Sequence, residues 1–325
     1  MNSPASKFQP WKEISPRSFR RGFLLLITPL LAILLGLVAS FSCRAEEAAL
    51  GKPLLWRIGG AKPSYVFGTI HLSGPRESRL APAVQKAVAE CDALLTEVPL
   101  DSASQMKVAT MMMAGDSSLK KTLPKDMYDR TDAILRQINP LLSLEPLDRL
   151  PVWAFGFMLP LIEEQLKNPG GKALDAQLYA RAETAGKQVG GIETLDEQMA
   201  VLSGFAPGDQ LAILRSTLDD MEKAQREKRS PIEELRECYL SGDLAKIEAK
   251  VNEWSKSMDP VLSKRVMTAL LTKRNHVMAG RIAAKVKESD GKSLFFAIGA
   301  AHLNGDEGVL KLLEKDGLKI ERVSE

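Results

Sequence analysis

The sequence predicts an α/β (α+β) domain in which strands from the two ends of residues 46–325 form one mixed β-sheet. Short apolar or β-branched runs concentrate near residues 54–98 and 294–323. The region between them, about 102–287, repeats apolar residues mainly at helical spacing. Gly and Pro separate many of the runs. We therefore expect a large helical insert, or cap, between the two groups of strands.

The first group of elements begins with two short strands, Leu54–Ile58 and Tyr65–Phe67. Their connector, GGAKPS, contains the Gly-Gly and Pro signals of a hairpin-like turn. Pro82–Glu90 has the pattern of a short amphipathic helix. Ala93–Val98 is an apolar strand that ends before a proline.

The insert consists mostly of helices, and several of them start at a proline, which suits the first helical turn. The expected helices are Ser102–Ala114, Lys125–Ile138, Pro151–Leu166, Leu174–Thr184, Leu195–Leu202, Gln210–Lys228, Ile232–Leu240, Leu244–Trp254 and a mostly helical Pro260–Lys287. Gln188–Ile192 is a short strand among them. After the insert we expect a strand at Leu294–Ile298, a helix at Glu307–Leu313 and a last strand at Lys319–Val323.

The net charge of +3 over 325 residues comes from the N-terminus. Residues 1–45 carry a net charge of +5, and residues 46–325 carry −2. A basic segment followed by 21 uncharged residues, 22–42, is typical of an export signal, with cleavage expected after Ala45. The same stretch is long enough to remain as a membrane anchor, and a lipoprotein site at Cys43 fits less well.

Both the signal and the anchor place residues 46–325 beyond the cytoplasmic membrane, in the periplasm or the cell envelope. An anchor would attach them to the inner membrane through residues 22–42, the only membrane contact that we expect. The basic character therefore belongs to targeting, and we expect no nucleic-acid partner. Export allows a Cys91–Cys238 disulfide, but two free thiols fit equally well. The oligomeric state is left open.

Two of the three histidines lie in matching segments, 231 residues apart. His71 follows a strand in GTIHL, and His302 follows a strand in GAAHL. Glycines at the end of a strand, here Gly68 and Gly299, allow tight turning or close approach of a ligand. Ligand crevices form where strands of α/β sheets end. A single histidine beside a strand is usually structural, but the repeated pattern favours a shared functional site.

Glu97 is the next candidate, because it lies in the apolar strand ALLTEV. A carboxylate is costly to bury unless it is paired or binds a metal. The structural alternative is an exposed or arginine-paired edge residue. Arg274 and Asn275 lie on a long helix among apolar residues, so that one of them can point inward to a carboxylate or an oxyanion. Glu193 precedes Thr194 and a capping-box pattern, for which a structural role is the simpler interpretation.

The chain lacks the HExxH, Walker, GxGxxG, GxSxG and CxxC motifs. Their absence disfavours a zincin, a nucleotide enzyme and a classical serine hydrolase. The Met cluster 111–113 and the aromatic side chains of Pro151–Leu166 are most simply core residues.

Taken with GIETLDE at residues 191–197, these segments resemble the TraB/GumN family, which includes PrgY and animal Tiki proteins. The resemblance covers about residues 50–323. It implies a mixed sheet with a helical insert, related to the erythromycin-esterase and ChaN-like group. The Tiki branch implies a metal-dependent protease, with His71, Glu97 and His302 as metal ligands. The GumN branch implies an envelope protein with no settled reaction.

The resulting hypothesis is a metal-dependent, peptidase-like hydrolase that acts on a peptide or another small envelope substrate. Glu97 and Arg274 would be catalytic, with Gly68, Gly299, Glu193 and Asn275 in support. Mixed nitrogen and oxygen ligation suits zinc, manganese or cobalt. Two alternatives stay open. One is a metal-free hydrolase with a histidine base and Glu97. The other is a non-enzymatic envelope protein that binds a peptide, haem or polysaccharide.

Overall fold

The computed structural model describes residues 52–60, 62–113 and 116–324, and in this part of the chain six strands form one mixed sheet. The spatial order of the strands is β4-β3-β5-β2-β1-β6. The strands are β1 Leu55–Ile58, β2 Ser64–Thr69, β3 Ala93–Thr96, β4 Gln188–Gly191, β5 Leu294–Gly299 and β6 Ile320–Arg322. The predicted fold class is confirmed, because strands from both ends of the domain share the sheet.

The connections set the direction of each strand. The short connector after β1 makes an antiparallel hairpin with β2, and β6 pairs antiparallel with the other edge of β1. Long helical connections separate β2, β3, β4 and β5, which are parallel. The residues of β3 and β5 are all buried, as expected for central parallel strands covered on both faces.

Helices make up most of the remaining described chain. The helices are α2 Pro82–Glu90, α3 Ser102–Met113, α4 Leu119–Thr122, α5 Lys125–Ile138, α6 Val152–Met158, α7 Ile162–Lys167, α8 Leu174–Thr184, α9 Leu195–Ser203, α10 Pro207–Arg226, α11 Pro231–Leu240, α12 Leu244–Lys256, α13 Pro260–Met267, α14 Lys273–Lys287 and α15 Val309–Lys315. Short 3-10 turns are η1 Glu145–Leu147, η2 Leu159–Leu161 and η4 Ala300–His302, and η3 Thr268–Thr272 is a π-helical turn.

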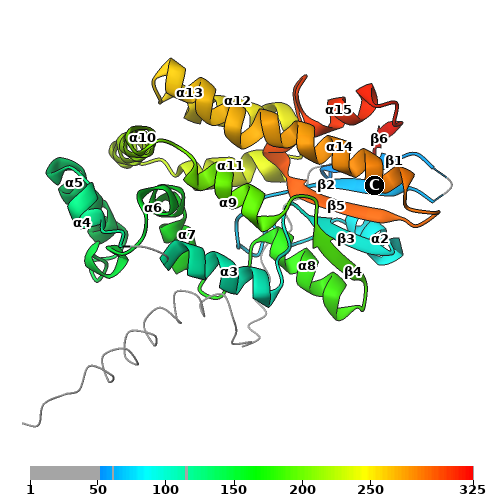
Figure 1. The fold of residues 1–325 in the computed structure, drawn as a ribbon, viewed down its shortest axis with the longest axis horizontal. Helices are drawn as coiled ribbons and strands as arrows, with labels where there is room; N and C mark the ends of the chain where they lie inside the picture. The colour runs from blue at the N-terminus through cyan, green and yellow to red at the C-terminus, as the bar shows by residue number, and fades with distance from the viewer. Residues whose placement is uncertain (1–51, 61, 114–115, 325) are drawn as a thin grey trace, which may run out of the picture.

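The helices form layers around the sheet (Figure 1). Helix α14 lies over one face, while α2 and α8 lie over the other, and the main hydrophobic core fills both interfaces. Helices α4, α5, α6 and α10 form a separate group at one side, with its own core around Phe155 and Leu214. The insert thus has a second hydrophobic core beside the sheet.

Two expected helices differ from the structure. Pro151–Leu166 is divided into α6, η2 and α7, because Pro160 cannot donate the backbone hydrogen bond that a continuous helix needs there. Pro260–Lys287 is interrupted by the π-helical turn η3, which ends directly before Lys273. Insertions of this type are frequent at functional sites. Helix α4 and the 3-10 turns η1 and η4 were not expected, and the other differences are shifts of a few residues at element ends.

The predicted export segment, residues 1–45, lies outside the described residues, so that both the signal and the anchor stay predictions. No helix in the part of the chain described here is long and apolar enough to cross a membrane.

Candidate active site

Four predicted site residues lie together at the carboxyl ends of the parallel strands. Strands β2, β3, β4 and β5 are parallel, so their carboxyl ends are on the same side of the sheet. Within three residues of each strand end follow, in the same order, His71, Glu97, Glu193 and His302. Helix α14 supplies the remaining pair, Arg274 and Asn275, both of which are buried. The strand-end rule behind the prediction therefore agrees with where these residues lie.

Glu97 is the first residue after β3 and is buried among donors. Its Oε1 accepts the backbone N–H of Gly299 (2.7 Å), and its Oε2 accepts from Arg274 Nη2 (2.5 Å) and Gln198 Nε2 (3.2 Å). Burial alone would raise the pKa of Glu97, but the charges of His302, Arg274 and His71 together hold that pKa well below its usual range. Glu97 is therefore an ionised, buried carboxylate. It is not exposed to solvent, but it is paired with an arginine, which was one form of the structural alternative.

Arg274 joins two buried carboxylates. Its Nη2 lies 2.5 Å from Glu193 Oε2 as well as from Glu97 Oε2, and its Nε donates to Glu193 (3.0 Å). Burial raises the pKa of Glu193 although Arg274 opposes the shift. The π-helical turn η3 immediately precedes this part of α14, and Arg274 Nη1 reaches back to the carbonyl of Leu270 (3.5 Å). One guanidinium thus holds the ends of β3 and β4 together.

His302 is buried and has a defined orientation. Asn275 Nδ2 donates to the carbonyl of Glu307 (2.8 Å), so its Oδ1 faces His302 Nδ1 (2.6 Å) as an acceptor. The Nδ1 atom of His302 therefore carries the proton, and the lone pair of Nε2 faces Arg274 Nη1 (3.3 Å) and Glu97 Oε1 (3.7 Å). Burial lowers the pKa of His302 to about 4, so the ring is neutral at pH 7.

His71 is the more open of the two rings, with 59% of its side chain exposed. Its Nδ1 lies 3.2 Å from Oδ2 of Asp175, in the first turn of α8. The negative charge of Asp175 raises the pKa of His71 to about 9. The Nε2 atom lies on the side of Gly299, so this ring has the carboxylate of Asp175 at Nδ1 and faces the site with Nε2.

Gly299 marks the point where the three candidate ligands converge. A Cβ at this position would lie 3.0 Å from Glu97 Oε1, 3.5 Å from His302 Cδ2 and 3.9 Å from His71 Nε2. A larger residue would fill this space, which explains why glycine ends β5. Gly68 has a different role, because a Cβ there would collide with Leu303 Cδ1 (2.8 Å). The first glycine of the paired motif therefore serves packing.

The donor set fits a divalent metal in its chemistry. Each ring is held at Nδ1 by an acceptor, and such outer partners orient histidine ligands in metal sites. The arrangement is not closed around an ion, since Arg274 lies between His302 Nε2 and Glu97. Accordingly, no group of three or more His, Cys, Asp or Glu side chains among the described residues could hold a metal ion as they now lie. Ligation by His302 requires Arg274 to release Nε2.

Other site contacts are partly those expected from the sequence. The capping box of Thr194 and Glu197 is present, and it starts the helix that carries Gln198 to Glu97. Asp175, Gln198 and Tyr239 were not expected at the site. The hydroxyl of Tyr239 donates a hydrogen bond to the carbonyl of Gly68 (2.9 Å) and so holds the end of β2 that leads to His71. Tyr239 is buried and the other two are half-buried, and no motif in the sequence marks any of the three.

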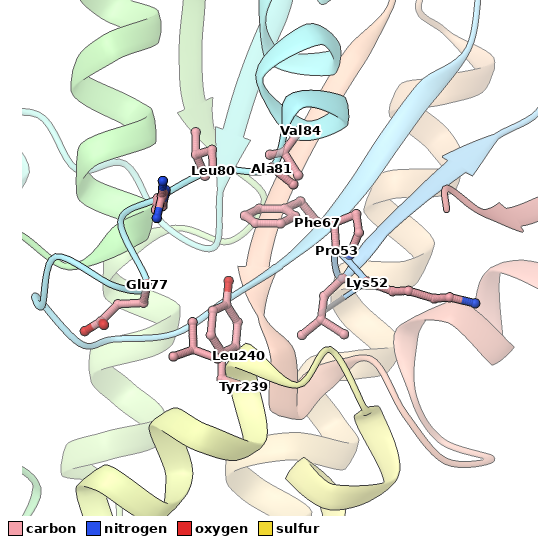
Figure 2. Close-up of a pocket in the computed structure, with 11 residues that line it drawn as sticks. Lys52, Pro53, Phe67, Glu77, Leu80, Ala81, Val84, Tyr239 and Leu240 are labelled. Atoms are coloured by element: carbon pink, nitrogen blue, oxygen red, sulfur yellow. The ribbon is translucent and has the colours of Figure 1, made fainter. Parts of the chain in front are cut away.

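A small cavity lies beside this region, not in it. Figure 2 shows its lining, which includes Phe67, Glu77 and Tyr239 and none of the six predicted site side chains. Its volume of about 50 Å³ holds a few water molecules at most. Glu77 accepts the backbone N–H of Gly74 (2.6 Å) and pairs with the buried Arg236 (3.1 Å). This contact anchors the loop that follows His71.

Cys91 and Cys238 are free thiols in the structure. Cys91 is buried and its Sγ lies 3.2 Å from Ser293 Oγ, while Cys238 is partly buried on α11. The Cys91–Cys238 bridge is therefore absent, and the free-thiol alternative describes both residues. Burial raises the pKa of Cys91 to about 11, which makes this thiol unreactive at neutral pH.

Comparisons with known proteins agree with the motif resemblance. A family profile described as the TraB/PrgY/gumN family matches residues 54–322. Metalloprotease TIKI1 of Danio rerio is 26% identical over 82% of this chain and 62% of the relative. Metalloprotease TIKI1 of Homo sapiens is 26% identical over 87% of this chain and 64% of the relative. A metalloprotease TIKI homolog of Nematostella vectensis is 23% identical over 83% of this chain and 66% of the relative.

The match covers only part of these relatives. The chain spans somewhat less than two thirds of the length of the two TIKI1 proteins. No solved structure matches the chain, so the erythromycin-esterase and ChaN-like comparison stays a prediction.

Proposed function

The chain belongs to the TraB/PrgY/gumN family, and from this premise we propose that residues 46–325 form an exported, metal-dependent hydrolase of the cell envelope that cleaves peptides. One observation carries the proposal. Glu97 Oε1, His302 and His71 Nε2 converge around Gly299, and each ring is held at its other nitrogen. The names of the TIKI relatives support the same class of chemistry.

His71, His302 and Glu97 would hold the metal, with zinc, manganese or cobalt as candidates. When bound, such an ion lowers the pKa of water and polarises a carbonyl group. Asn275 keeps the Nε2 lone pair of His302 directed at the site, and Asp175 does the same for His71 by accepting from Nδ1. Both rings must be deprotonated at Nε2 to bind a metal, so protons compete with the metal.

Arg274 would have two tasks in this reaction. It pairs with both Glu193 and Glu97 at rest, and it presents an N–H group beside His302 Nε2. Release from His302 would free the ligand and leave the guanidinium beside the substrate carbonyl. There it could stabilise negative charge that develops on oxygen. Glu193 would retain Arg274 during this movement, since it contacts both Nε and Nη2.

The test combines metal analysis of the purified protein with peptidase assays before and after chelation. We expect about one divalent ion per chain, loss of activity with a chelator and recovery when metal is returned. His71→Ala and His302→Ala should each lower activity by more than about 100-fold, because even outer partners of metal ligands cost 10–100-fold. His276→Ala is the matched control, since this exposed ring pairs with Glu307 on the surface.

Two other outcomes favour the alternatives. Activity that survives chelation but is lost in His302→Ala would indicate a metal-free hydrolase, for which the 3.7 Å separation of His302 Nε2 and Glu97 Oε1 is the supporting contact. A protein that binds a peptide, haem or polysaccharide unchanged, and still binds it without His71 and His302, would be a non-enzymatic binding protein.

A further inference from the structure

Strand β4 forms one edge of the sheet and runs directly into the site. It pairs with β3 and has no second neighbouring strand in the described sheet. Two residues beyond its last residue, Gly191, lies Glu193, which contacts Arg274. Arg281 fixes the turn between them by donating to the carbonyl of Ile192 (3.1 Å) and to Glu197.

The register shows which backbone groups of β4 point outward. Gly191 pairs with Thr96, and the N–H of Ile192 donates to the carbonyl of Thr96 (2.9 Å). In a parallel pair, alternate residues direct both their N–H and C=O groups to the neighbour. Gly190 therefore faces β3, while Val189 and Gly191 direct their N–H and C=O groups away from it. An edge of this kind is a template for a further strand.

A groove of about 410 Å³ runs along the same strand. Its floor includes Ala93, Leu95 and Gly190, which share one face of the sheet because Leu95 pairs with Gly190. A Cβ at Gly190 would meet nothing within 4 Å, so the absence of a side chain leaves the floor open. The space is large enough for a side chain of a chain segment that pairs with β4.

The groove wall carries charges of both signs. Lys285, Glu288, Asp290 and Lys292 follow one another at the end of α14 and in the turn after it, so both signs of charge line the same side of the groove. A wall with balanced charge does not select one charge on a ligand. The edge therefore suits a ligand that is recognised through its backbone.

We infer that β4 binds an extended polypeptide by strand addition and delivers it to the Glu97, Arg274 and His302 cluster. The inference rests on the proposed function, because it names the substrate class of the same site as unfolded or extended peptide with broad side-chain tolerance. Backbone hydrogen bonds to Val189 and Gly191 give affinity, and the groove accepts one side chain. The peptide then continues past Ile192 toward Glu193 and Arg274.

The experiment measures binding of a fluorescein-labelled pool of random dodecapeptides by anisotropy, with chelator present so that no turnover occurs. Val189→Pro removes an outward N–H without removing a hydrogen bond to β3. We expect at least about fivefold weaker binding, since this substitution also places a ring against the incoming strand. Val189→Ala is the control, because it keeps the N–H and should bind within about twofold of wild type.

Gly190→Val provides a second variant in case Val189→Pro does not fold. Its side chain fits the open space over Gly190 and fills the floor of the groove, so binding should weaken several-fold. A further probe uses the wild-type protein with altered peptides. Peptides whose backbone is N-methylated at every second residue keep one edge able to hydrogen-bond to β4 and should still bind. Peptides N-methylated at every residue should not bind.

Wild-type protein that does not bind the pool, or a folded Val189→Pro protein that binds it normally, would overturn the inference. Equal binding of the fully N-methylated pool would do the same. Cleavage assays separate the two proposals. Cleavage with an unchanged KM in Val189→Pro leaves the proposed function standing and removes the inference. If peptide binding depends on the edge of β4 but no metal supports cleavage, strand addition at β4 stands and the proposed hydrolase function fails.

Discussion

The two histidine segments have the same sequence pattern and opposite surroundings. His71 leaves 59% of its side chain exposed and is paired with the carboxylate of Asp175, which raises its pKa to about 9. His302 is 6% exposed and is paired with the neutral amide of Asn275, and its pKa is lowered to about 4. The motif fixes where each ring stands relative to a strand end. The partner from a distant helix decides its charge.

The register explains part of this asymmetry. Gly299 pairs with Thr69, so the two glycines of the motif are one residue out of step across β2 and β5. His302 belongs to the 3-10 turn η4 and contacts Asn275 of α14, whereas His71 lies on a loop and contacts Asp175 of α8. One half of the site is therefore built on buried ion pairs, and the other on a surface contact.

The largest effect is expected where the buried half loses its only arginine. Arg274→Gln leaves Glu97 and Glu193 without a guanidinium between them, and removal of one partner from a buried pair costs about 3–5 kcal/mol. We expect this loss of unfolding free energy in urea at pH 7. The loss should be smaller at pH 4, because carboxylates that have lost Arg274 protonate more readily in the variant. Arg265→Gln is the control, because the exposed Arg265–Asp209 pair contributes about 0–1 kcal/mol. Equal stability of the two variants would contradict the buried-half description.

The second effect is a loss of stability in mild acid that originates at His302. Its pKa is about 4 in the folded protein and 6.5 ordinarily, so the unfolded chain binds the proton first as the pH falls. Stability from this ring is present above pH 6.5 and decreases by about 2 kcal/mol between pH 6.5 and 5. The measurement is the difference between urea unfolding of wild type and of His302→Gln across this range. His71 acts in the other direction, because its raised pKa contributes stability that disappears as the pH rises through 9.

Asn275→Asp is the matched control for the acid effect. The substitution places a carboxylate at His302 Nδ1 and gives this ring the type of partner that His71 has. The pKa of His302 should rise and the slope of stability against pH should flatten. A slope that stays as steep as in wild type would mean that another group causes the acid sensitivity.

The sequence predicts most of this site because its residues follow strand ends. His71, Glu97 and His302 could be found from the repeated motif and from a carboxylate in an apolar strand. The neighbourhood of α14 allowed Arg274 and Asn275 to point inward. Asp175 could not be found, because an acidic residue in the first turn of a helix usually interacts with the helix dipole and needs no tertiary partner. Its proximity to His71 depends on how α8 crosses the sheet.

The fold shows the same limit. Apolar runs and glycine or proline signals locate the strands and most helices, but they carry no sign of the π-helical turn before Arg274. The turn continues α13 into α14 without a break, and no glycine or proline within Thr268–Thr272 marks it. The position of Arg274 between Glu97 and His302 was likewise not visible in the sequence, although it decides whether the three candidate ligands can close around an ion.

The smallest effect is expected on the exposed half of the site. Asp175→Asn keeps an oxygen near His71 Nδ1 but removes the negative charge that is the main cause of its raised pKa. The pKa of His71 should fall from about 9 toward its ordinary value, while the unfolding free energy should change less than in Arg274→Gln because the His71–Asp175 pair is partly exposed and screened by solvent. Nitrogen-detected NMR of the imidazole rings measures the shift, and the ring of His276, paired with Glu307, should give the same signal in both proteins. A His71 pKa that stays near 9 in this variant would locate the cause in Glu97 instead, and the two halves of the site would then be one electrostatic unit.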